Sequence, residues 1–486
     1  MKKRIAVIFA AVLALAGAVG CGGKANDSDV TLTIWSYYNG DQATAFTALV
    51  SEFNETIGEE KGIFVEHSGK GGVNDLISAV ENSANGKLGS DELPDMAFSY
   101  ADTAYDLDAK GALADLDNYF NETELDAYAP GFIEEGRWGT GLKILPFAKS
   151  TEIMVLNRTD WDKFVTGWNA AAPVGEKVSL QDLATIEGLV SVSEKYYQQT
   201  NGKALFGRDA MANYMIVGAR QLGQEIFEVK TDGTPVFHTE EAIMRKLWNN
   251  YYVPYVKGYF TAEGAYRSDD MSLGKIIAAM GSCSSASYYK NKVQTDKESY
   301  DIENIVLEAP RFATKPDGTP AVQVAVQQGA GITVLKSTSR RESASAEFLK
   351  WMTQGSRNIQ FAGQSGYLPV RTNYLTESKI TEYVEENVQS ATIRQSLVMG
   401  ARTMSSCELY TSKPFVKGND ARKVVENALQ TVAKADRAQL LKDVEDGADY
   451  DTELSALLTD ANFNTWLNRL RLDLAGAVIP EVTLSV

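Results

Sequence analysis

Cysteine and histidine are scarce in this chain, whose 486 residues include three cysteines and two histidines. The histidines, His67 and His238, lie far apart in the sequence and have no cysteine beside them. A protein metal site needs several Cys, His or acidic ligands at close spacing. The sequence therefore contains no metal-ligand cluster, and we expect neither a metal ion nor another cofactor.

The two cysteines beyond the N-terminal region leave the redox state open. They are Cys283 and Cys407. In an exported chain they can pair as a disulfide, and they can equally be two separate buried thiols. The sequence does not decide between these arrangements.

Several catalytic and ion-binding motifs are absent. The segment Gln327-Gln328-Gly329-Ala330-Gly331 looks like a phosphate-binding loop, but GxGxxG is not completed, so close backbone packing at a strand entrance explains its glycines as well. The nucleophile motif GxSxG does not occur. The acidic run 443–451 fails as a calcium loop because its sixth position is Ala448, where the loop needs glycine.

Basic residues are too few to balance the acidic ones. The chain has 47 Lys and Arg against 64 Asp and Glu, a formal net charge of −17. Such a chain repels nucleic acid and anionic lipid head groups. We therefore expect no nucleic-acid partner, and contact with a membrane only through a lipid anchor.

One long apolar run stands at the start of the chain. Lys2, Lys3 and Arg4 precede apolar residues 5–15, a pattern typical of a signal peptide and too short for a membrane span. Ala18-Val19-Gly20-Cys21 then resembles a bacterial lipobox, although an ordinary cleaved signal with an incidental cysteine gives the same letters. We expect a signal peptide over 1–20, lipid on Cys21, a tether over 22–29, and export with anchoring to the cell membrane.

The pattern that follows is typical of an α/β protein. Residues 30–35 alternate as a strand, and Phe46, Leu49, Val50 and Phe53 then recur at helical spacing after Asp41, a plausible N-cap. The chain is also longer than one ordinary core. We therefore expect at least two α/β domains.

Residues 145–157 organise the rest of the chain. Pro146 prevents a regular helix, Ser150 and Thr151 follow, and the apolar run 153–156 reads as a buried strand. The two hydroxyls would lie where that strand begins, where they can face a ligand or only solvent.

This stretch, "LPFAKSTEIMVLNRTDW", resembles the first crossing segment of the extracellular solute-binding proteins of family 1, the maltose-binding-protein-like receptors of ABC importers. Three other segments resemble the same family: residues 31–53, residues 94–120 ("PDMAFSYADTAYDLDAKGALADLDNYF") and residues 327–371, from "QQGAGITVLK" to "GYLPVR".

The resemblance implies a two-lobe periplasmic-binding-protein-like fold with a ligand cleft between lobes that are joined by crossing segments. It places lobe 1 at 30–146 plus 330–368, and lobe 2 at 147–329 plus 369–486. It also implies a monomeric receptor that captures a small solute and delivers it to the permease subunits of an ABC importer, without enzymatic turnover.

Within the family, the sequence resembles the glycerol-3-phosphate-binding and sugar-binding lipoproteins. Trp35 is a candidate because it lies at the end of an expected strand, and Arg208 because it lies at an expected helix start that Asp209 would cap. The resemblance adds the other candidates. The candidate ligand-binding residues are Trp35, Tyr100, Asp102, Ser150, Arg208, Ser284, Gly329, Tyr367 and Arg422. Each also has a simpler reading as a core, turn or solvated residue. The sequence departs from that group in several positions. Val73 stands where the group has a tyrosine, and Asp102 stands where it has a glutamate. Arg208 and Met211 stand where it has two tryptophans. The solute therefore stays open between a carbohydrate and a polyol phosphate.

The alternatives are an exported carbohydrate-active enzyme and a structural surface lipoprotein. The enzyme would need two carboxylates facing each other across the cleft. The adjacent pairs Glu240/Glu241, Asp269/Asp270 and Glu385/Glu386 do not meet this need, because neighbouring side chains on one element do not face one another.

Overall fold

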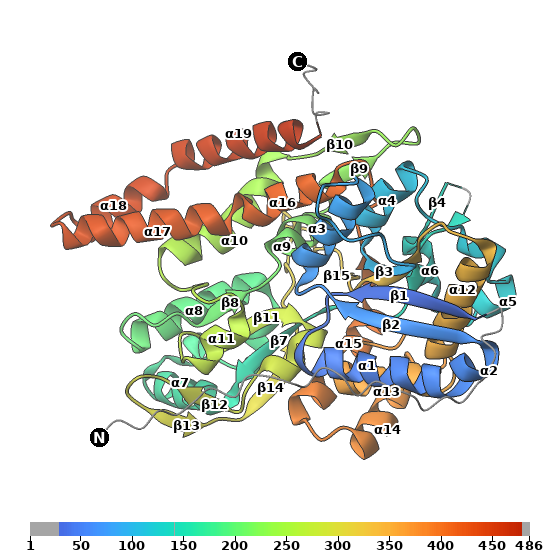
Figure 1. The fold of residues 1–486 in the computed structure, drawn as a ribbon. Coiled ribbons are helices and arrows are strands. Elements are labelled where there is room, and N and C mark those ends of the chain that lie inside the picture. Colours follow the sequence, from blue (N-terminus) through green and yellow to red (C-terminus); the bar gives the residue numbers. More distant parts are fainter. Residues whose placement is uncertain (1–28, 140, 479–486) are drawn as a thin grey trace, which may run out of the picture.

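A computed structural model describes residues 29–139 and 141–478, and the expected signal peptide, Cys21 and nearly all of the tether lie outside these ranges. Two separate β-sheets, each with its own helices, form the two halves of the molecule (Figure 1). We refer to the half that contains β1 as lobe 1 and to the half that contains β7 as lobe 2.

The sheet of lobe 1 mixes early and late parts of the chain. Its strand order is β2 (Ile63–Gly69), β1 (Val30–Ser36), β3 (Met96–Ser99), β16 (Gly331–Val334) and β6 (Leu145–Pro146). The first three strands are parallel, whereas β16 runs antiparallel to both β3 and β6. The longer helices of this half are α1 (Gly40–Phe53), α3 (Val73–Ala84), α4 (Ala101–Ala109), α6 (Pro130–Glu135), α12 (Ser339–Thr353) and α13 (Arg357–Ser365), and the shorter ones are α2 (Glu59–Lys61) and α5 (Glu122–Leu125).

Helix α1 illustrates why these residues fold as they do. The apolar side chains expected on one face, from Phe46 to Phe53, are buried. The expected cap is wrong, because the helix begins at Gly40, so that Asn39 is the N-cap residue and Asp41 lies in the first turn. An acidic side chain there still interacts favourably with the positive end of the helix dipole.

The sheet of lobe 2 has the order β14 (Asn304–Glu308), β7 (Glu152–Asn157), β11 (Ala278–Ser282) and β8 (Phe206–Arg208). Strand β7 confirms the buried strand predicted over 153–156, and all six of its residues are buried. The helices of this half are α7 (Arg158–Ala171), α8 (Ile186–Gln199), α9 (Met211–Gln221), α10 (Glu241–Val256), α11 (Arg267–Ser272), α14 (Glu377–Asn387), α15 (Ala391–Ser406), α16 (Gly418–Ala428), α17 (Gln430–Glu445), α18 (Tyr450–Leu457) and α19 (Asp460–Ala477).

Short ribbons and turns complete the described chain. The two-stranded ribbons are β4 (Arg137–Trp138) with β5 (Gly141–Leu142), β9 (Phe227–Val229) with β10 (Pro235–Phe237), β12 (Lys292–Gln294) with β13 (Ser299–Asp301), and β15 (Val324–Val326) with β17 (Glu408–Tyr410). The irregular helical turns are η1 (Asn54–Gly58), η2 (Leu116–Asn118), η3 (Val174–Glu176), η4 (Leu180–Ala184) and η5 (Cys283–Tyr288).

Each half has a hydrophobic core of its own. One cluster takes its residues from 30–148 and 330–370, and a second takes them from 154–326 and 410–474. A third, smaller cluster lies beneath α14 and α15, which belong to lobe 2. The polar side chains between the first two clusters therefore form the boundary between the lobes. In this structure Cys283 and Cys407 are two free thiols.

The chain crosses this boundary three times, and the crossings lie side by side. Lys149 and Leu368 exchange backbone hydrogen bonds of 3.2 and 2.7 Å, and Ser150 and Gln328 exchange bonds of 2.8 and 3.0 Å. Segments that are distant in sequence are thus joined into one narrow connection between two separate cores. Such a connection can act as a hinge, because a few junction residues absorb the backbone change.

Candidate functional site

The sheet edges of the two lobes face each other across the crossing segments. In lobe 1, β3 ends at Ser99, which pairs with Gly331 at the start of β16. In lobe 2, β11 ends at Ser282, which pairs with Glu152 at the start of β7, while the parallel β8 ends at Arg208. The residues at these edges therefore meet at the lobe boundary, the position at which open α/β sheets bind ligands.

Lobe 1 contributes a group of tyrosines to this boundary. Tyr37 follows β1, and its ring stacks on that of Tyr100, with centroids 6.3 Å apart and 22° between the planes. Tyr367, on the third crossing segment, donates from its hydroxyl to that of Tyr37 over 3.3 Å. Burial raises the pKa of all three phenols, so they stay protonated and can donate hydrogen bonds. The buried hydroxyl of Tyr38 has no partner among the described residues.

Lobe 2 contributes a row of small hydroxyl groups to the same boundary. The Oγ atoms of Ser150 and Ser282 lie 2.5 Å apart, and those of Ser282 and Ser284 lie 2.7 Å apart. The Sγ atom of Cys283 is 3.1 Å from Ser150 Oγ, and burial raises the pKa of this thiol. The Thr151 hydroxyl is buried without a partner in the described part of the chain.

One side chain of lobe 1 reaches across to this row. The amide of Gln42, in the first turn of α1, donates to the Ser284 carbonyl over 3.1 Å and to the Ser365 carbonyl over 3.2 Å. At the exposed rim, Tyr288 of lobe 2 donates to Asn39 Oδ1 of lobe 1 over 3.0 Å. The lobes are therefore in direct polar contact along this side.

The charged groups beside the serines are largely neutralised within the protein. Arg208 and Glu152 are buried and joined by an ion pair of 2.9 Å. The Asn213 amide donates to Glu152 Oε1 over 3.1 Å and to Gln328 Oε1 over 2.9 Å, and it accepts from Arg422 Nη2 over 2.6 Å. These contacts link β7 and β8 of the lobe 2 sheet to α9, to the second crossing segment and to α16 in one network.

A second buried ion pair holds the crossing segments. Lys149 Nζ lies 2.7 Å from Glu135 Oε2 and 2.7 Å from the Gly329 carbonyl. Gly329 itself has φ +93°, and a Cβ there would lie 2.4 Å from the Ala148 carbonyl oxygen. Only glycine fits this close approach without a backbone shift.

On the other side of the boundary, α4 of lobe 1 meets the start of α16 in lobe 2. The Asn419 amide donates to Thr103 Oγ1 over 2.9 Å. A Cβ on Gly418 would lie 2.2 Å from an oxygen of Asp102, so that carboxyl packs directly on the helix start. Burial raises the pKa of Asp102 to about 7, and the nearby positive charge of Arg422 opposes this rise in part.

The structure thus brings most of the predicted site residues together at the lobe boundary. They are Tyr100, Asp102, Ser150, Arg208, Ser284, Gly329, Tyr367 and Arg422. Their roles in binding remain a prediction.

The environments expected for Trp35 and Arg208 differ from those observed. Trp35 is not part of this group, because its side chain lines a separate cavity on lobe 1, where Lys70 Nζ lies 4.0 Å from the ring centroid. Arg208 ends strand β8 instead of starting a helix. Asp209 does not cap α9, because it pairs with Arg267 while the carboxylate of Glu426 in α16 accepts from the first N–H groups of that helix.

Sequence reasoning missed the residues that link the group: Tyr37, Gln42, Glu152, Asn213 and Gln328. The aromatic pair Tyr37-Tyr38, directly after the first strand, carried a signal that could have found one of them. Glu152 and Asn213 gave no local signal, since their partners are distant in sequence.

Two further observations concern metals and membranes. Within residues 29–139 and 141–478, no three His, Cys, Asp or Glu side chains form a group that could hold a metal ion. In the same ranges, every helix falls short of the length and apolar character that crossing a bilayer requires.

Two α/β lobes, three crossings and a polar boundary between the lobes are the features of a two-lobe periplasmic-binding-protein fold. The sequence profile of the bacterial extracellular solute-binding proteins matches residues 48–388. The chain belongs to this family, as its sequence predicts. No curated protein matches the sequence significantly.

Solved structures share the fold at low identity. The cyclic alpha-maltosyl-1,6-maltose binding protein from Arthrobacter globiformis has a TM-score of 0.61 at 18% identity, covering 91% of this chain and 100% of its own. UgpB from Mycobacterium tuberculosis, in complex with glycerophosphocholine, has a TM-score of 0.63 at 18% identity, covering 93% and 100%. The maltotriose binding protein of Thermus thermophilus has a TM-score of 0.62 at 13% identity, covering 92% and 100%. At these identities the likeness concerns the fold.

Proposed function

We propose that this protein is the solute-binding receptor of an ABC importer and that it captures a neutral carbohydrate between its lobes. The observation that carries the proposal is the composition of the lobe boundary, where buried tyrosines of lobe 1 face serine hydroxyls and amides of lobe 2. Aromatic faces together with groups that both donate and accept suit a sugar, whose apolar ring faces alternate with hydroxyls.

The charge balance favours a neutral solute over a phosphate. Arg208 is already neutralised by Glu152, and Lys149 by Glu135, so neither cation is left over for an anion. Arg422 remains, and Asp102 lies close enough to reduce its field. A polyol phosphate is the second candidate, supported by Arg422 and by the glycerophosphocholine complex of UgpB, a protein of similar fold.

The mechanism follows from the two-lobe architecture. A solute that touches both lobes binds the closed form more tightly than the open form, and this difference in affinity shifts the population toward closure. The direct contacts of Gln42 with the Ser284 carbonyl and of Asn419 with Thr103 are interlobe bonds that opening would break. The closed receptor would then be the form that docks on a permease.

The finer assignments belong to the same proposal. Lobe 1 comprises 30–146 with 330–368, and lobe 2 comprises 147–329 with 369–486. The hydrophobic clusters support this division away from the crossings, where Phe147, Ala148 and Val370 pack in the lobe 1 core and Leu368 packs in the smaller lobe 2 core. Lipid on Cys21, after a signal peptide over 1–20, would hold the receptor near a permease. A monomer suffices for this task.

We propose binding without turnover. A glycoside hydrolase needs one carboxylic acid and one carboxylate free to act on opposite sides of the bond. At this boundary Glu152 is engaged by Arg208 and Asn213, and Glu135 by Lys149 and Gln327. These carboxylates support the lobes and would not be available for catalysis.

A thermal-shift screen followed by calorimetric titration tests the proposal. A solute that binds only the folded protein raises the unfolding midpoint by mass action. We expect a neutral sugar from a panel of mono- and oligosaccharides to raise it, and glycerol-3-phosphate to have no effect. Stabilisation by glycerol-3-phosphate alone would reverse the choice of solute. An unfolding midpoint that no compound of the panel raises would contradict both candidates.

The variant Tyr367→Phe sharpens this test because it removes one boundary hydroxyl and keeps the ring. We expect the affinity for the identified sugar to fall about threefold to tenfold, the usual effect of one lost hydrogen bond. Tyr266→Phe, at an exposed tyrosine, is the matched control and should leave the affinity unchanged. Release of a cleaved product during incubation would support the enzyme alternative.

A further inference from the structure

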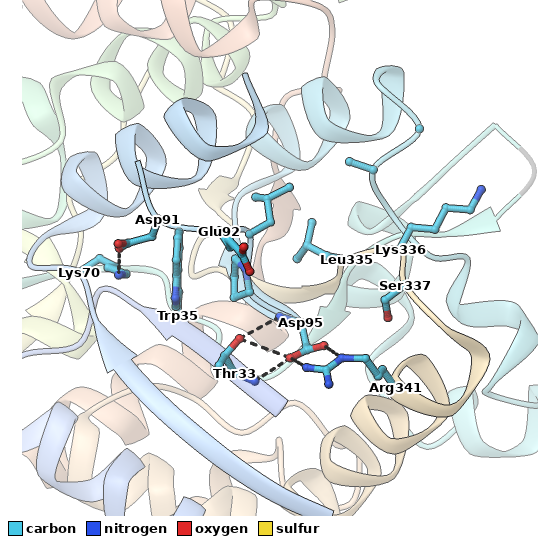
Figure 2. A pocket seen from close by; sticks show the side chains of 14 residues that line it. Thr33, Trp35, Lys70, Asp91, Glu92, Asp95, Leu335, Lys336, Ser337 and Arg341 are labelled. Atoms are coloured by element: carbon cyan, nitrogen blue, oxygen red, sulfur yellow. Dashed lines mark hydrogen bonds and ion pairs between the residues drawn. The ribbon is translucent and has the colours of Figure 1, made fainter. Parts of the chain in front are cut away.

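Lobe 1 contains a cavity of about 980 Å³ that is separate from the lobe boundary (Figure 2). Its lining comes from β1, from the loop that precedes β3, from residues 111–112, and from residues 335–341 at the start of α12. All of these segments belong to lobe 1. The cavity is thus preformed within one rigid unit, and its shape does not depend on closure.

Trp35 is the aromatic residue that lines this cavity. Only 5% of its surface is exposed, and its indole N–H makes no hydrogen bond within the described residues, although it is not one of their fully buried polar atoms. Figure 2 shows the ring standing between Asp91 and Glu92, with its nitrogen end toward Thr33. The N–H is therefore open to the water in the cavity, and a guest that supplies an acceptor can take the place of that water.

The charges around the cavity cancel. Three basic side chains (Lys70, Lys336 and Arg341) stand against three acidic ones (Asp91, Glu92 and Asp95). Lys70 pairs with Asp91 over 2.8 Å, and Arg341 holds Asp95 through two bonds of 2.6 and 2.7 Å. The side chains of Glu92 and Lys336 have no partner among the described residues, and one carries each sign.

These lining side chains determine which class of ligand the cavity can bind. With no net charge, the lining does not select a free anion or cation, but it offers both acceptors and donors at short range. Hydroxyl groups both donate and accept, and their bonds to ionised side chains are stronger than bonds between neutral groups. We propose that lobe 1 carries a second binding site, built around Trp35, for a neutral carbohydrate unit.

The proposal goes beyond the solute site at the lobe boundary. Because no lining residue comes from lobe 2, occupation of the Trp35 site cannot by itself favour closure. A receptor with this site would hold a sugar on its outer surface in the open and closed forms alike. It would therefore bind two carbohydrate units with different affinities.

The test uses fluorine NMR of the full folded chain labelled with 5-fluorotryptophan. The Trp35 resonance is assigned by its loss in Trp35→Phe, which keeps a ring and removes the N–H. The probes are glucose, galactose, mannose, maltose, inorganic phosphate and choline. We expect at least one neutral sugar to shift the Trp35 resonance saturably, and phosphate and choline to leave it unmoved. A shift by phosphate or choline alone, or no shift with any probe, overturns the proposal.

Two variants make the assignment specific. Glu92→Gln changes an exposed acceptor and should weaken binding at Trp35 at least fivefold, whereas Glu60→Gln, at an exposed glutamate of α2 away from the cavity, should not. Arg422→Met disturbs the lobe boundary and should leave the Trp35 titration unchanged. Loss of the Trp35 response in Arg422→Met would show that the resonance reports on the boundary site and would refute a second site. The two proposals can thus fail separately.

Discussion

The lobe boundary and the Trp35 cavity use similar chemistry in different mechanical settings. Both combine aromatic groups with charged side chains that neutralise one another. The boundary takes its groups from both lobes and from the crossing segments, whereas the cavity takes all of its groups from lobe 1. Only the boundary can therefore convert binding into a change of conformation, since a ligand shifts an equilibrium only through its different affinity for the two states.

The largest effect is expected from Arg208→Met, which leaves Glu152 buried without its cation. Breaking such a buried pair costs about 3–5 kcal/mol of unfolding free energy. Binding at the boundary should also be lost, because Asn213 shares Glu152, while the Trp35 titration should persist. Denaturant unfolding measures the first effect and calorimetry the second.

The control for this prediction is Arg469→Met, which breaks the exposed pair with Asp473 in α19. Exposed pairs contribute about 0–1 kcal/mol. Equal losses of stability in the two variants would contradict the role given to the buried pair.

The next effect concerns Gly329 in the second crossing segment. Gly329→Ala places a methyl group 2.4 Å from a carbonyl oxygen at a positive φ. We expect a loss of about 1–3 kcal/mol in unfolding free energy and weaker binding at the boundary only. Gly355→Ala has φ +57° with no atom within 4 Å of the added Cβ, so it carries the backbone strain alone. Calorimetric melting of both variants separates the clash from the strain, and identical melting curves would refute the clash.

A smaller effect is the pH dependence contributed by Asp102. Its pKa is about 7 in the folded protein against 3.8 for a free aspartate, so the folded state binds this proton more tightly than the unfolded chain does. The penalty for burying this charge is absent below about pH 4 and complete above about pH 7. Stability should therefore fall as pH rises through this range, on the order of 1 kcal/mol because partial solvent access screens the group.

Asp102→Asn should remove this component and make the protein more stable than the wild type at pH 8. Urea midpoints measured from pH 5 to pH 8 provide the test, with Asp451→Asn in α18 as an exposed control. Arg422, Asp106 and Glu135 also act on Asp102. An unchanged pH profile in Asp102→Asn would show that they, and not Asp102, control it.

The smallest effect is expected at the exposed rim, where Tyr288→Phe removes the bond to Asn39. A partly solvated hydrogen bond contributes about 0.5–1 kcal/mol, so the affinity at the boundary should weaken about twofold to fivefold. The Trp35 cavity should not respond. A change of more than tenfold would mean that Tyr288 touches the solute itself.

Much of the fold could be predicted from the sequence because its signals are local. The buried strand at 153–156 and the apolar face of α1 followed from periodicity, and the crossings followed from family segments. The predicted N-cap of α1, Asp41, is wrong, and Asn39 is the N-cap residue instead. Either residue satisfies the local sequence pattern.

The site could be predicted only in part, because its contacts are long-range. Asn213 and Arg422 lie 209 residues apart in sequence, and Glu152 and Arg208 lie 56 apart, so no local pattern relates them. Alternation along β1 places Trp35 on one face of the sheet, but it does not say which face serves the boundary. Trp35, a predicted site residue, consequently lies in the lining of the lobe 1 cavity and not with the group at the lobe boundary.

The insertion of β16 into the sheet of lobe 1 also bears on how the chain folds. Strand β3 pairs with β1 on one side and with residues 331–334 of β16 on the other. Those residues are synthesised more than 230 residues after β3. Until they arrive, β3 is an unpaired edge that can join another chain. A protein with this connectivity should fold slowly, and it should gain from a holding chaperone while its last lobe-1 strand is still being made.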